Sequence, residues 1–410
     1  MPATTDPDIP GRMTATEIRA SVSLASIFGL RMLGLFLILP VFAVHAKSLP
    51  GGDNALLVGL AMGMYGLTQA FGQIPFGMAS DKYGRKPIIV IGLILFAFGS
   101  LIAAGADSVL GVIVGRAVQG AGAVSAAVTA LIADSTRDEH RTKAMAAVGA
   151  SIGLTYALSL VISPLLYQSV GMGGMFLLVA VLSVLAIAVV IFIVPQAPAR
   201  LPEKASFMQV LRDPELLRMN FGVFALHAIQ MSMFIVLPTA LVQSAGLPLD
   251  QHWKIYLPVV LLSFVLMLPP IFMGEKRGKM KQVFVSAIVL LLIVEIGLLE
   301  AMSQPVLSVN LVVMLLLAFF VAFNILEASQ PSLVSRLAPS GARGAALGVY
   351  NTMQAVGLFF GGALGGLVAQ YFGGRGVFIV GCLLTVAWLI IASSMKSLPR
   401  RGKPQQTVPV

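Results

Sequence analysis

Charged residues and cysteine are scarce in this sequence. Asp, Glu, Lys and Arg make up 11% of the 410 residues, whereas charged residues make up about 25% of a typical soluble domain. Hydrophobic residues make up 58%, which excludes a water-soluble globular fold and predicts a protein that crosses a membrane several times. The one cysteine, Cys382, lies inside an apolar run. A disulfide framework and a thiolate metal site are therefore excluded.

Two broad classes of function have no support in the sequence. It contains no metal-ligand cluster, nucleophile motif or phosphate-binding loop, and its glycine-rich stretches lie within apolar runs. We therefore expect neither an enzyme nor a bound cofactor or metal. The formal net charge of +10 comes from Lys and Arg spread over short loops between apolar runs. Membrane topology explains that pattern, so we expect no nucleic-acid partner.

Twelve apolar segments follow a polar start. Each has at least about 20 residues, and at about 1.5 Å per residue such a helix crosses a hydrocarbon core of about 30 Å. The predicted spans are 22–46, 55–79, 87–107, 108–133, 144–168, 172–195, 219–242, 254–274, 282–302, 306–330, 344–371 and 375–395. The sequence therefore predicts an all-α membrane protein with twelve transmembrane helices.

A polar linker divides these spans into two groups of six. The expected divisions are an N-terminal tail (1–21), a first half (22–195), a linker (196–218) with a short surface helix near 207–211, a second half (219–395) and a C-terminal tail (396–410). Faint repetition relates the halves, because the pattern at 81–85 recurs at 275–279 and Gly174-x-Phe176 recurs 202 positions later. We expect two pseudo-symmetric halves, a repeat pattern found in secondary transporters.

The distribution of Lys and Arg predicts the orientation. Of the 27 such residues, 22 lie in the tails, the linker and the loops on one side of the predicted membrane. The other side has only Lys47, Lys254 and Arg375, and two arginines lie within spans. Because Lys and Arg accumulate in cytoplasmic loops, we expect both termini to be cytoplasmic.

A charged decapeptide, Gly77 to Lys86, separates the second span from the third. We expect both helices to end there, because a charged loop cannot lie in lipid. Its pattern Gly-x-x-x-Asp-Lys-x-Gly-Arg-Lys resembles the signature loop of the major facilitator superfamily. Members of that superfamily move small solutes by rocking two six-helix halves about a central site. An ordinary cytoplasmic loop would need Lys or Arg, but not this spacing of Gly and Asp.

This resemblance implies the major facilitator fold for residues 22–396. Within the superfamily the chain is most similar to the twelve-span drug/proton antiporter branch and to its YajR-like inner-membrane members. Those relatives often have a small soluble domain after the last span, which we do not expect here. The resemblance also implies that Asp81 and Arg85 make an interdomain charge contact near the eleventh span, with Asp134 joining it. The implied conformational-gate residues are Gly77, Asp81, Lys82, Gly84, Arg85, Lys86 and Asp134.

Two arginines lie within predicted spans, where an ionisable side chain costs at least about 2.5–3.5 kcal/mol. Arg116, with Gln119-Gly120 after it, resembles a second motif of the superfamily, whose arginine is linked to proton transfer. The alternative is a structural role, in which Arg116 binds carbonyls of the first helix. We expect Arg31 to face the central cavity on the substrate or proton pathway, unless its side chain extends to the inner surface.

The second half has its own ionisable residues within predicted spans. His227 can exchange protons near neutral pH, although it can also be a packing residue. Asn324 and Glu327 lie one turn apart, on one helix face, and Glu327 is the best candidate for a carboxylate that alternates between protonated and ionised forms. Glu295 is either a further pathway residue or a neutral acid bonded to a neighbouring helix.

Together these features predict a secondary transporter of a small solute in a bacterial inner membrane. We expect proton-coupled efflux by alternating access, with the lipid bilayer as surroundings, the proton gradient as energy source and a monomer as functional unit. The fifth span has Gly149, Gly153 and Pro164 but lacks the paired glycines that follow in efflux antiporters. A proton-coupled nutrient symporter or a uniporter therefore stays an alternative, and a non-transporting receptor is a third.

Overall fold

The computed structural model of this chain describes residues 13–122, 124–196, 207–339 and 342–396, without the side chains of residues 138, 139, 141, 142, 146, 150 and 207. The described part is helical and has no strand. Its first half contains α1 (Ala15–Phe36), α2 (Phe42–His45), η1 (Ala46–Ser48), α3 (Ala55–Tyr83), α4 (Arg85–Ala104), α5 (Val109–Ala121), α6 (Ser125–Ser135), α7 (Asp138–Ala188) and η2 (Val189–Ile193). Its second half contains α9 (Pro214–Gln243), η3 (Leu249–Gln251), α10 (Trp253–Arg277), α11 (Met280–Ala301), α12 (Val309–Leu337) and α13 (Arg343–Ser393).

Two of these helices cross the membrane twice. In the described ranges, ten helices are long and apolar enough to span a membrane, and α7 and α13 have 51 residues each. Gly171 (φ 66°) interrupts α7 and Gly373 (φ 65°) interrupts α13, in a backbone conformation that suits glycine. Each is thus two helices joined without a loop, and the prediction of twelve spans is confirmed for the described part of the chain.

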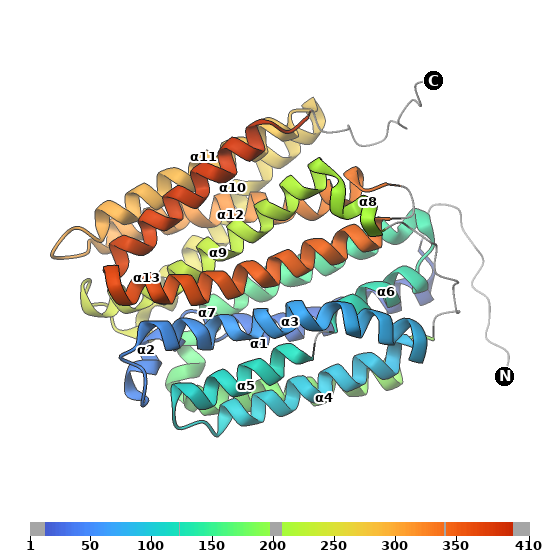
Figure 1. Cartoon of the computed structure of the whole chain (residues 1–410), viewed down its shortest axis with the longest axis horizontal. Coiled ribbons are helices and arrows are strands. Elements are labelled where there is room, and N and C mark those ends of the chain that lie inside the picture. The colour runs from blue at the N-terminus through green and yellow to red at the C-terminus, as the bar shows by residue number, and fades with distance from the viewer. Residues whose placement is uncertain (1–12, 123, 197–206, 340–341, 397–410) are drawn as a thin grey trace.

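The same two glycines support the internal repeat. Gly171 and Gly373 are 202 positions apart, as are Gly174 and Gly376. Both halves therefore turn between their fifth and sixth spans at an equivalent position. Figure 1 shows the result: α3, α4 and α5 lie on one side of the bundle, α10, α11 and α12 on the other, and α9 with the first part of α13 between them.

Several predicted boundaries differ from the structure. α3 continues to Tyr83, so most of the decapeptide from Gly77 is helical and only Gly84 (φ 96°) interrupts the chain before α4. α1 starts at Ala15, before the predicted residue 22, because Thr14 and Glu17 form a capping box. The parts of the predicted tails and linker at 1–12, 197–206 and 397–410 lie outside the described residues.

The fourth predicted span is interrupted rather than continuous. It consists of α5 and α6, which are separated at Gly122. A Cβ at Gly122 would lie 2.3 Å from the carbonyl oxygen of Gly92 on α4, so only glycine allows this approach. The predicted surface helix of the linker is confirmed as α8 (Phe207–Arg212).

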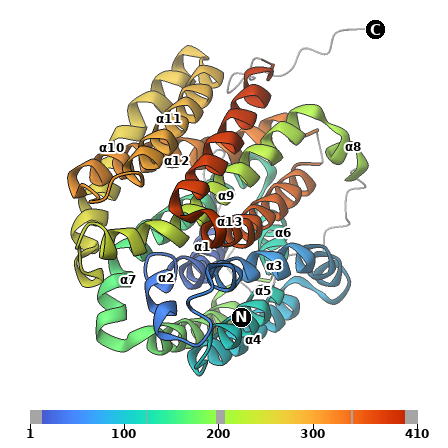
Figure 2. The same cartoon turned by 60° about the vertical axis from the view of Figure 1, so that its left-hand side comes forward.

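The two halves are in close contact at one end of the bundle, which we call the Ala55 end. There α3 packs against α13 through glycine: a Cβ at Gly59 would lie 2.1 Å from the carbonyl oxygen of Gly362. The backbone N–H of Ala55 also donates to the Oε1 atom of Gln370 at 2.6 Å. Figure 2 shows the bundle turned so that the end with α2 comes forward.

The other end, which we call the Asp81 end, has helix faces without close neighbours. Gly149 and Gly153 lie on α7, and Gly344 and Gly348 on α13. A Cβ added at any of these four glycines would have no described atom within 4 Å. The halves therefore meet tightly at the Ala55 end, while faces of α7 and α13 stay uncovered at the Asp81 end.

Candidate substrate and proton pathway

Two buried arginines in the first half lie against one aromatic ring. The guanidinium carbon of Arg31 (α1) is 5.6 Å from the ring centroid of Tyr65 (α3), and that of Arg116 (α5) is 4.9 Å away. Both arginines are at most 1% exposed. The negative face of an aromatic ring attracts cations, so Tyr65 supplies part of the stabilisation that water would otherwise give.

Neutral polar groups accept the hydrogen bonds of these arginines. Arg116 donates to the Oε1 atom of Gln119 at 2.8 Å and to the backbone carbonyl of Gly34 on α1 at 3.4 Å. Gln119 in turn donates to Ser100 on α4 at 2.7 Å. Arg31 donates to the hydroxyl of Ser125 on α6. The second motif thus ties α5 to α1 and α4, as the structural alternative for Arg116 expects.

No carboxylate in the described part of the chain pairs with either arginine. The Nε and Nη2 atoms of both Arg31 and Arg116 are buried without a hydrogen-bond partner there. A buried charge without a counter-charge is strongly destabilising. The first half therefore contains a concentrated, uncompensated positive charge, which would attract an anionic group.

A second polar cluster lies in the other half and centres on His227 (α9). Its Nε2 atom is 3.7 Å from the Oε2 atom of Glu327 (α12) and 2.7 Å from the Nε2 atom of Gln354 (α13). Its Nδ1 atom faces the carbonyl of Val223 at 2.9 Å. Since a carbonyl only accepts, Nδ1 carries a proton, and Nε2 accepts from Gln354 when the ring is neutral.

Glu327 is the member of this cluster with access to open space. Its side chain is 18% exposed, whereas that of His227 is 1% exposed. Its Oε2 atom, which faces the imidazole, is buried and has no hydrogen-bond partner among the described residues. Nearby, Tyr350 donates to Gln330 at 3.3 Å, which extends the polar cluster along α12 and α13.

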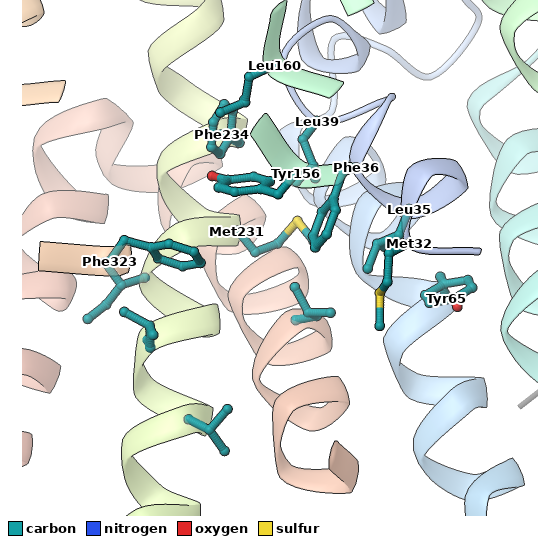
Figure 3. Close-up of a cluster of buried hydrophobic side chains, with 14 of the residues drawn as sticks. Met32, Leu35, Phe36, Leu39, Tyr65, Tyr156, Leu160, Met231, Phe234 and Phe323 are labelled. Atoms are coloured by element: carbon teal, nitrogen blue, oxygen red, sulfur yellow. The ribbon is translucent and has the colours of Figure 1, made fainter. Parts of the chain in front are cut away.

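Aromatic side chains fill the space between the two clusters. The ring of Tyr156 (α7) lies 4.8 Å from Phe36 (α1) and 5.3 Å from Phe323 (α12), measured between centroids. Phe323 in turn lies 5.9 Å from the ring of His227. Figure 3 shows Phe36, Tyr156 and Phe323 with Met231 of α9, so residues from both halves meet in one apolar layer.

Two predicted pathway residues lie outside both clusters. Asn324 donates to Ser263 on α10 at 3.0 Å, so its amide joins two helices of the second half rather than the cluster of Glu327. Glu295 (α11) is 2% exposed and packs against Gly381 in α13, where a Cβ would lie 2.0 Å from its Oε2 atom. Glu295 thus packs against a neighbouring helix, whereas the bond to that helix expected of a neutral acid is not among the hydrogen bonds of the described residues.

The predicted gate residues come together within the first half. Arg85 pairs with Asp81, and its Nε atom lies 3.0 Å from the Oδ2 atom of Asp134 on α6. Lys86 donates to the carbonyl of Val194 at the end of the sixth span. The expected interdomain contact with the eleventh span is not among the ion pairs of the described residues. Instead, the start of α13 is uncovered at Gly344.

The smaller parts of the gate have defined positions as well. Gly77 packs against α6, because a Cβ there would lie 3.7 Å from the Cβ of Ala126. The ammonium of Lys82 lies 5.1 Å from the ring centroid of Tyr83. In the second half Glu275 on α10, the counterpart of Asp81 in the repeat, pairs with Arg336 on α12 at 2.7 Å.

Comparison with known proteins decides the family. The sequence profile described as Major Facilitator Superfamily matches residues 24–361 and 272–408. The chain belongs to the major facilitator superfamily. It is 46% identical over 397 residues to the inner membrane transport protein YajR of Escherichia coli (strain K12), a match that covers 95% of this chain and 86% of YajR.

More distant relatives agree with this assignment. The multidrug resistance protein MdtH of Aeromonas salmonicida (strain A449) is 28% identical, over 84% of this chain and 86% of its own. The crystal structure of a D-xylose-proton symporter superposes with a TM-score of 0.72 at 16% identity, over 94% of this chain and 99% of the symporter. That likeness shows the shared fold. The chain is thus a multi-pass membrane transporter of the major facilitator type and not an enzyme.

As a major facilitator protein, the chain has a candidate site at the interface of its halves that sequence reasoning found only in part. The missed residues are neutral or aromatic: Tyr65, Tyr156, Gln330, Tyr350 and Gln354. These side chains are uncharged and lie inside apolar runs, so they do not stand out in the sequence as the arginines and glutamates do. A search for every uncharged polar residue in the predicted spans would have found Gln330 and Gln354.

Proposed function

We propose that this protein exports a small, largely apolar solute in exchange for protons, by alternating access of the halves 22–195 and 219–395. The observation that carries this proposal is the position of Glu327, whose side chain is 18% exposed and whose Oε2 atom lies 3.7 Å from His227, beside the apolar layer between the halves. A carboxylate in such a position can release and take up a proton while the conformation changes.

The packing at the two ends of the bundle supports an inward-facing state. The Ala55 end is closed by contacts such as Gly59 on Gly362, whereas α7 and α13 have uncovered faces at the Asp81 end. Because Lys and Arg concentrate in the loops of the Asp81 end, that end would be cytoplasmic, as would both termini. The protein would then accept its solute from the cytoplasm. The inner-membrane relative YajR supports a bacterial inner membrane as its location.

The character of the lining supports an apolar or amphipathic solute. Phe36, Tyr156, Phe323 and Met231 provide aromatic and polarisable surface, which adapts to different apolar shapes. The relatives named for multidrug resistance support efflux of such compounds. In the proposed cycle, Glu327 releases its proton on the cytoplasmic side as the solute binds, and it takes up a proton from outside when the solute leaves.

Reconstituted vesicles test this function. A thermal-shift screen of the purified protein, at pH values on either side of neutral, first identifies a compound that raises the melting temperature by binding the folded state. Uptake of that compound is then measured under imposed proton gradients. An antiporter accumulates it when the vesicle interior is acidic, and a symporter when the exterior is acidic. A uniporter responds to neither gradient, and a receptor moves no compound.

A further inference from the structure

A groove on the outer flank of the second half is separate from both polar clusters. It lies between α10, α11 and α12 near the Asp81 end and has a volume of about 540 Å³. Pro269 and Met273 at its rim are exposed, so it opens towards the surroundings of the bundle. In a membrane this flank would face lipid, because α10, α11 and α12 form one side of the bundle in Figure 1.

The sequence of α10 explains why a groove forms here. Pro269 and Pro270 follow each other inside the helix and remove two backbone donors, which interrupts the regular packing of a helix on its neighbours. One turn later α10 and α11 approach closely, since a Cβ at Gly274 would lie 2.7 Å from Val283. The groove thus occupies the gap that opens beside a glycine contact.

The mouth of the groove is positively charged. Arg277 and Lys279 line it and are exposed, and among the described residues neither has an acidic partner. Glu275, near the end of α10, pairs with Arg336 on α12. Segment 275–281 contains four cationic residues. Clusters of this size next to the cytoplasmic end of a transmembrane helix attract anionic lipid head groups.

The start of α11 adds a second, independent preference for an anion. The helix begins at Met280, and Lys279 at its N-cap makes no side-chain capping hydrogen bond. Its first turn has no acidic residue, although the free N–H groups and dipole of a helix N-terminus favour negative charge. Gln282 and Val283 of this same turn line the groove. A phosphate there would satisfy N–H groups and cations together.

The deeper part of the groove is apolar. Leu290 on α11 and Val321 and Ile325 on α12 line it. Leu290 is ten residues from the start of α11, which corresponds to about 15 Å along a helix and so to about half of the hydrocarbon thickness. A single lipid with its head group at Arg277 would therefore have its acyl chain beside these residues.

We propose that this groove binds one anionic phospholipid of the cytoplasmic leaflet. Its phosphate contacts Arg277, Lys279 and the N-terminus of α11, and an acyl chain lies along Leu290 and Ile325. The site is independent of proton coupling, although Ile325 lies two residues from Glu327 on the same helix. The lipid would thus contact the helix that carries the proposed proton carrier.

Lipid binding to the full chain in detergent tests the proposal. Phosphatidylglycerol is expected to form discrete one-to-one adducts in native mass spectrometry and to raise the melting temperature, whereas phosphatidylcholine with the same acyl chains does neither. The double variant Arg277→Gln/Lys279→Gln is expected to bind phosphatidylglycerol about 10- to 30-fold more weakly. Lys276→Gln is the matched control, because Lys276 precedes Arg277 in the last turn of α10 but does not line the groove. It is expected to bind nearly as tightly as the parent.

A charge-neutral variant tests the groove itself. Ser286 lines it and is exposed, so Ser286→Trp fills the apolar part and leaves every cation in place. We expect this variant to fold, as its melting curve without lipid would show, and to lose the phosphatidylglycerol adduct. Equal binding by Ser286→Trp, or an equal loss in Lys276→Gln, would overturn the groove as the site. An equal rise of the melting temperature with inorganic phosphate would show that the groove binds a free anion and not a lipid. A dimer that dissociates when phosphatidylglycerol binds would show that the groove is an interface with a second copy of the chain.

Discussion

The Nε2 atom of His227 lies 3.7 Å from the Oε2 atom of Glu327, and the two side chains come from different helices of the second half. Gln354 occupies the hydrogen-bonding position at the same nitrogen, at 2.7 Å. Glu327 therefore contacts the imidazole without replacing this amide. The carboxylate of Glu327 is therefore free to change its protonation state, because the imidazole of His227 keeps its hydrogen bond with Gln354 in either case.

This geometry predicts the effect of Glu327→Gln. The amide has nearly the same shape as the carboxylic acid but cannot release a proton, so we expect compound binding to persist and proton movement to stop. The measurement is compound-driven change of internal pH in reconstituted vesicles, alongside the thermal shift with the same compound. Glu295→Gln is the matched control, since it alters another acid within the spans of the second half, one that is 2% exposed and packs on Gly381. Compound-driven proton movement by Glu327→Gln, or its loss in Glu295→Gln, would contradict the assignment of Glu327 as the proton carrier.

Arg116 offers a test of the uncompensated charge in the first half. Arg116→Met removes a buried cation that has no acidic partner among the described residues, and it also removes the hydrogen bonds to Gln119 and to the carbonyl of Gly34. Replacing buried charges with apolar groups is often neutral or stabilising by about 1–4 kcal/mol. We therefore expect a melting temperature at or above that of the parent, together with loss of transport.

The comparison with Arg116→Lys separates charge from geometry. An ammonium keeps the charge but cannot stack on Tyr65 and donate to both Gln119 and Gly34 as a planar guanidinium does. We expect this variant to have a lower melting temperature than Arg116→Met. If Arg116→Met had the lower melting temperature of the two, the role of Arg116 would be to join helices rather than to supply a charge for transport.

Closure at the Ala55 end depends on glycine, which predicts the effect of Gly59→Val. Its side chain would collide with the carbonyl of Gly362, whose oxygen lies 2.1 Å from a Cβ at position 59. We expect the variant to disfavour the closed state at this end. A cysteine pair at Ala55 and Gln370, in a Cys382→Ser background, reports closure through a short thiol crosslinker, because the side chain of Gln370 reaches the backbone of Ala55.

Gly149→Val on α7 is the matched control for Gly59→Val. A Cβ there has no atom within 4 Å in this state, so the same crosslink should form as in the parent. We expect Gly149→Val to impair transport only if the Asp81 end also closes during the cycle. Equal crosslinking in Gly59→Val and the parent would show that the α3–α13 contact does not control closure.

The twelve spans were predictable because lipid imposes a simple rule on sequence. Every backbone group must be satisfied inside its own helix, so each crossing needs a long apolar run. Boundaries were harder, because α3 runs on to Tyr83 and the fourth span is interrupted at Gly122. These features depend on a cap or on the approach of a neighbouring helix, which the apolar pattern does not encode.

The candidate site was predictable where a charge stood out against an apolar background. Arg31, Arg116, His227 and Glu327 were found in this way, but the partners of these residues were not. Gln354 is 127 positions from His227, and only the packing of α9 against α13 brings them together. Hydropathy assigns residues to helices but does not say which helix faces meet.

The apolar layer between the halves gives a final prediction, for Tyr156. Its ring contacts Phe36 on α1 and Phe323 on α12, so Tyr156→Ala leaves a cavity between the halves and should lower the unfolding free energy by about 3–5 kcal/mol. The same cavity would admit water between the two polar clusters, and we expect a faster passive proton leak in vesicles without compound. Tyr156→Phe keeps the ring contacts and should leak no faster than the parent. If vesicles with Tyr156→Ala leaked protons no faster than vesicles with the parent, side chains other than Tyr156 would close this layer.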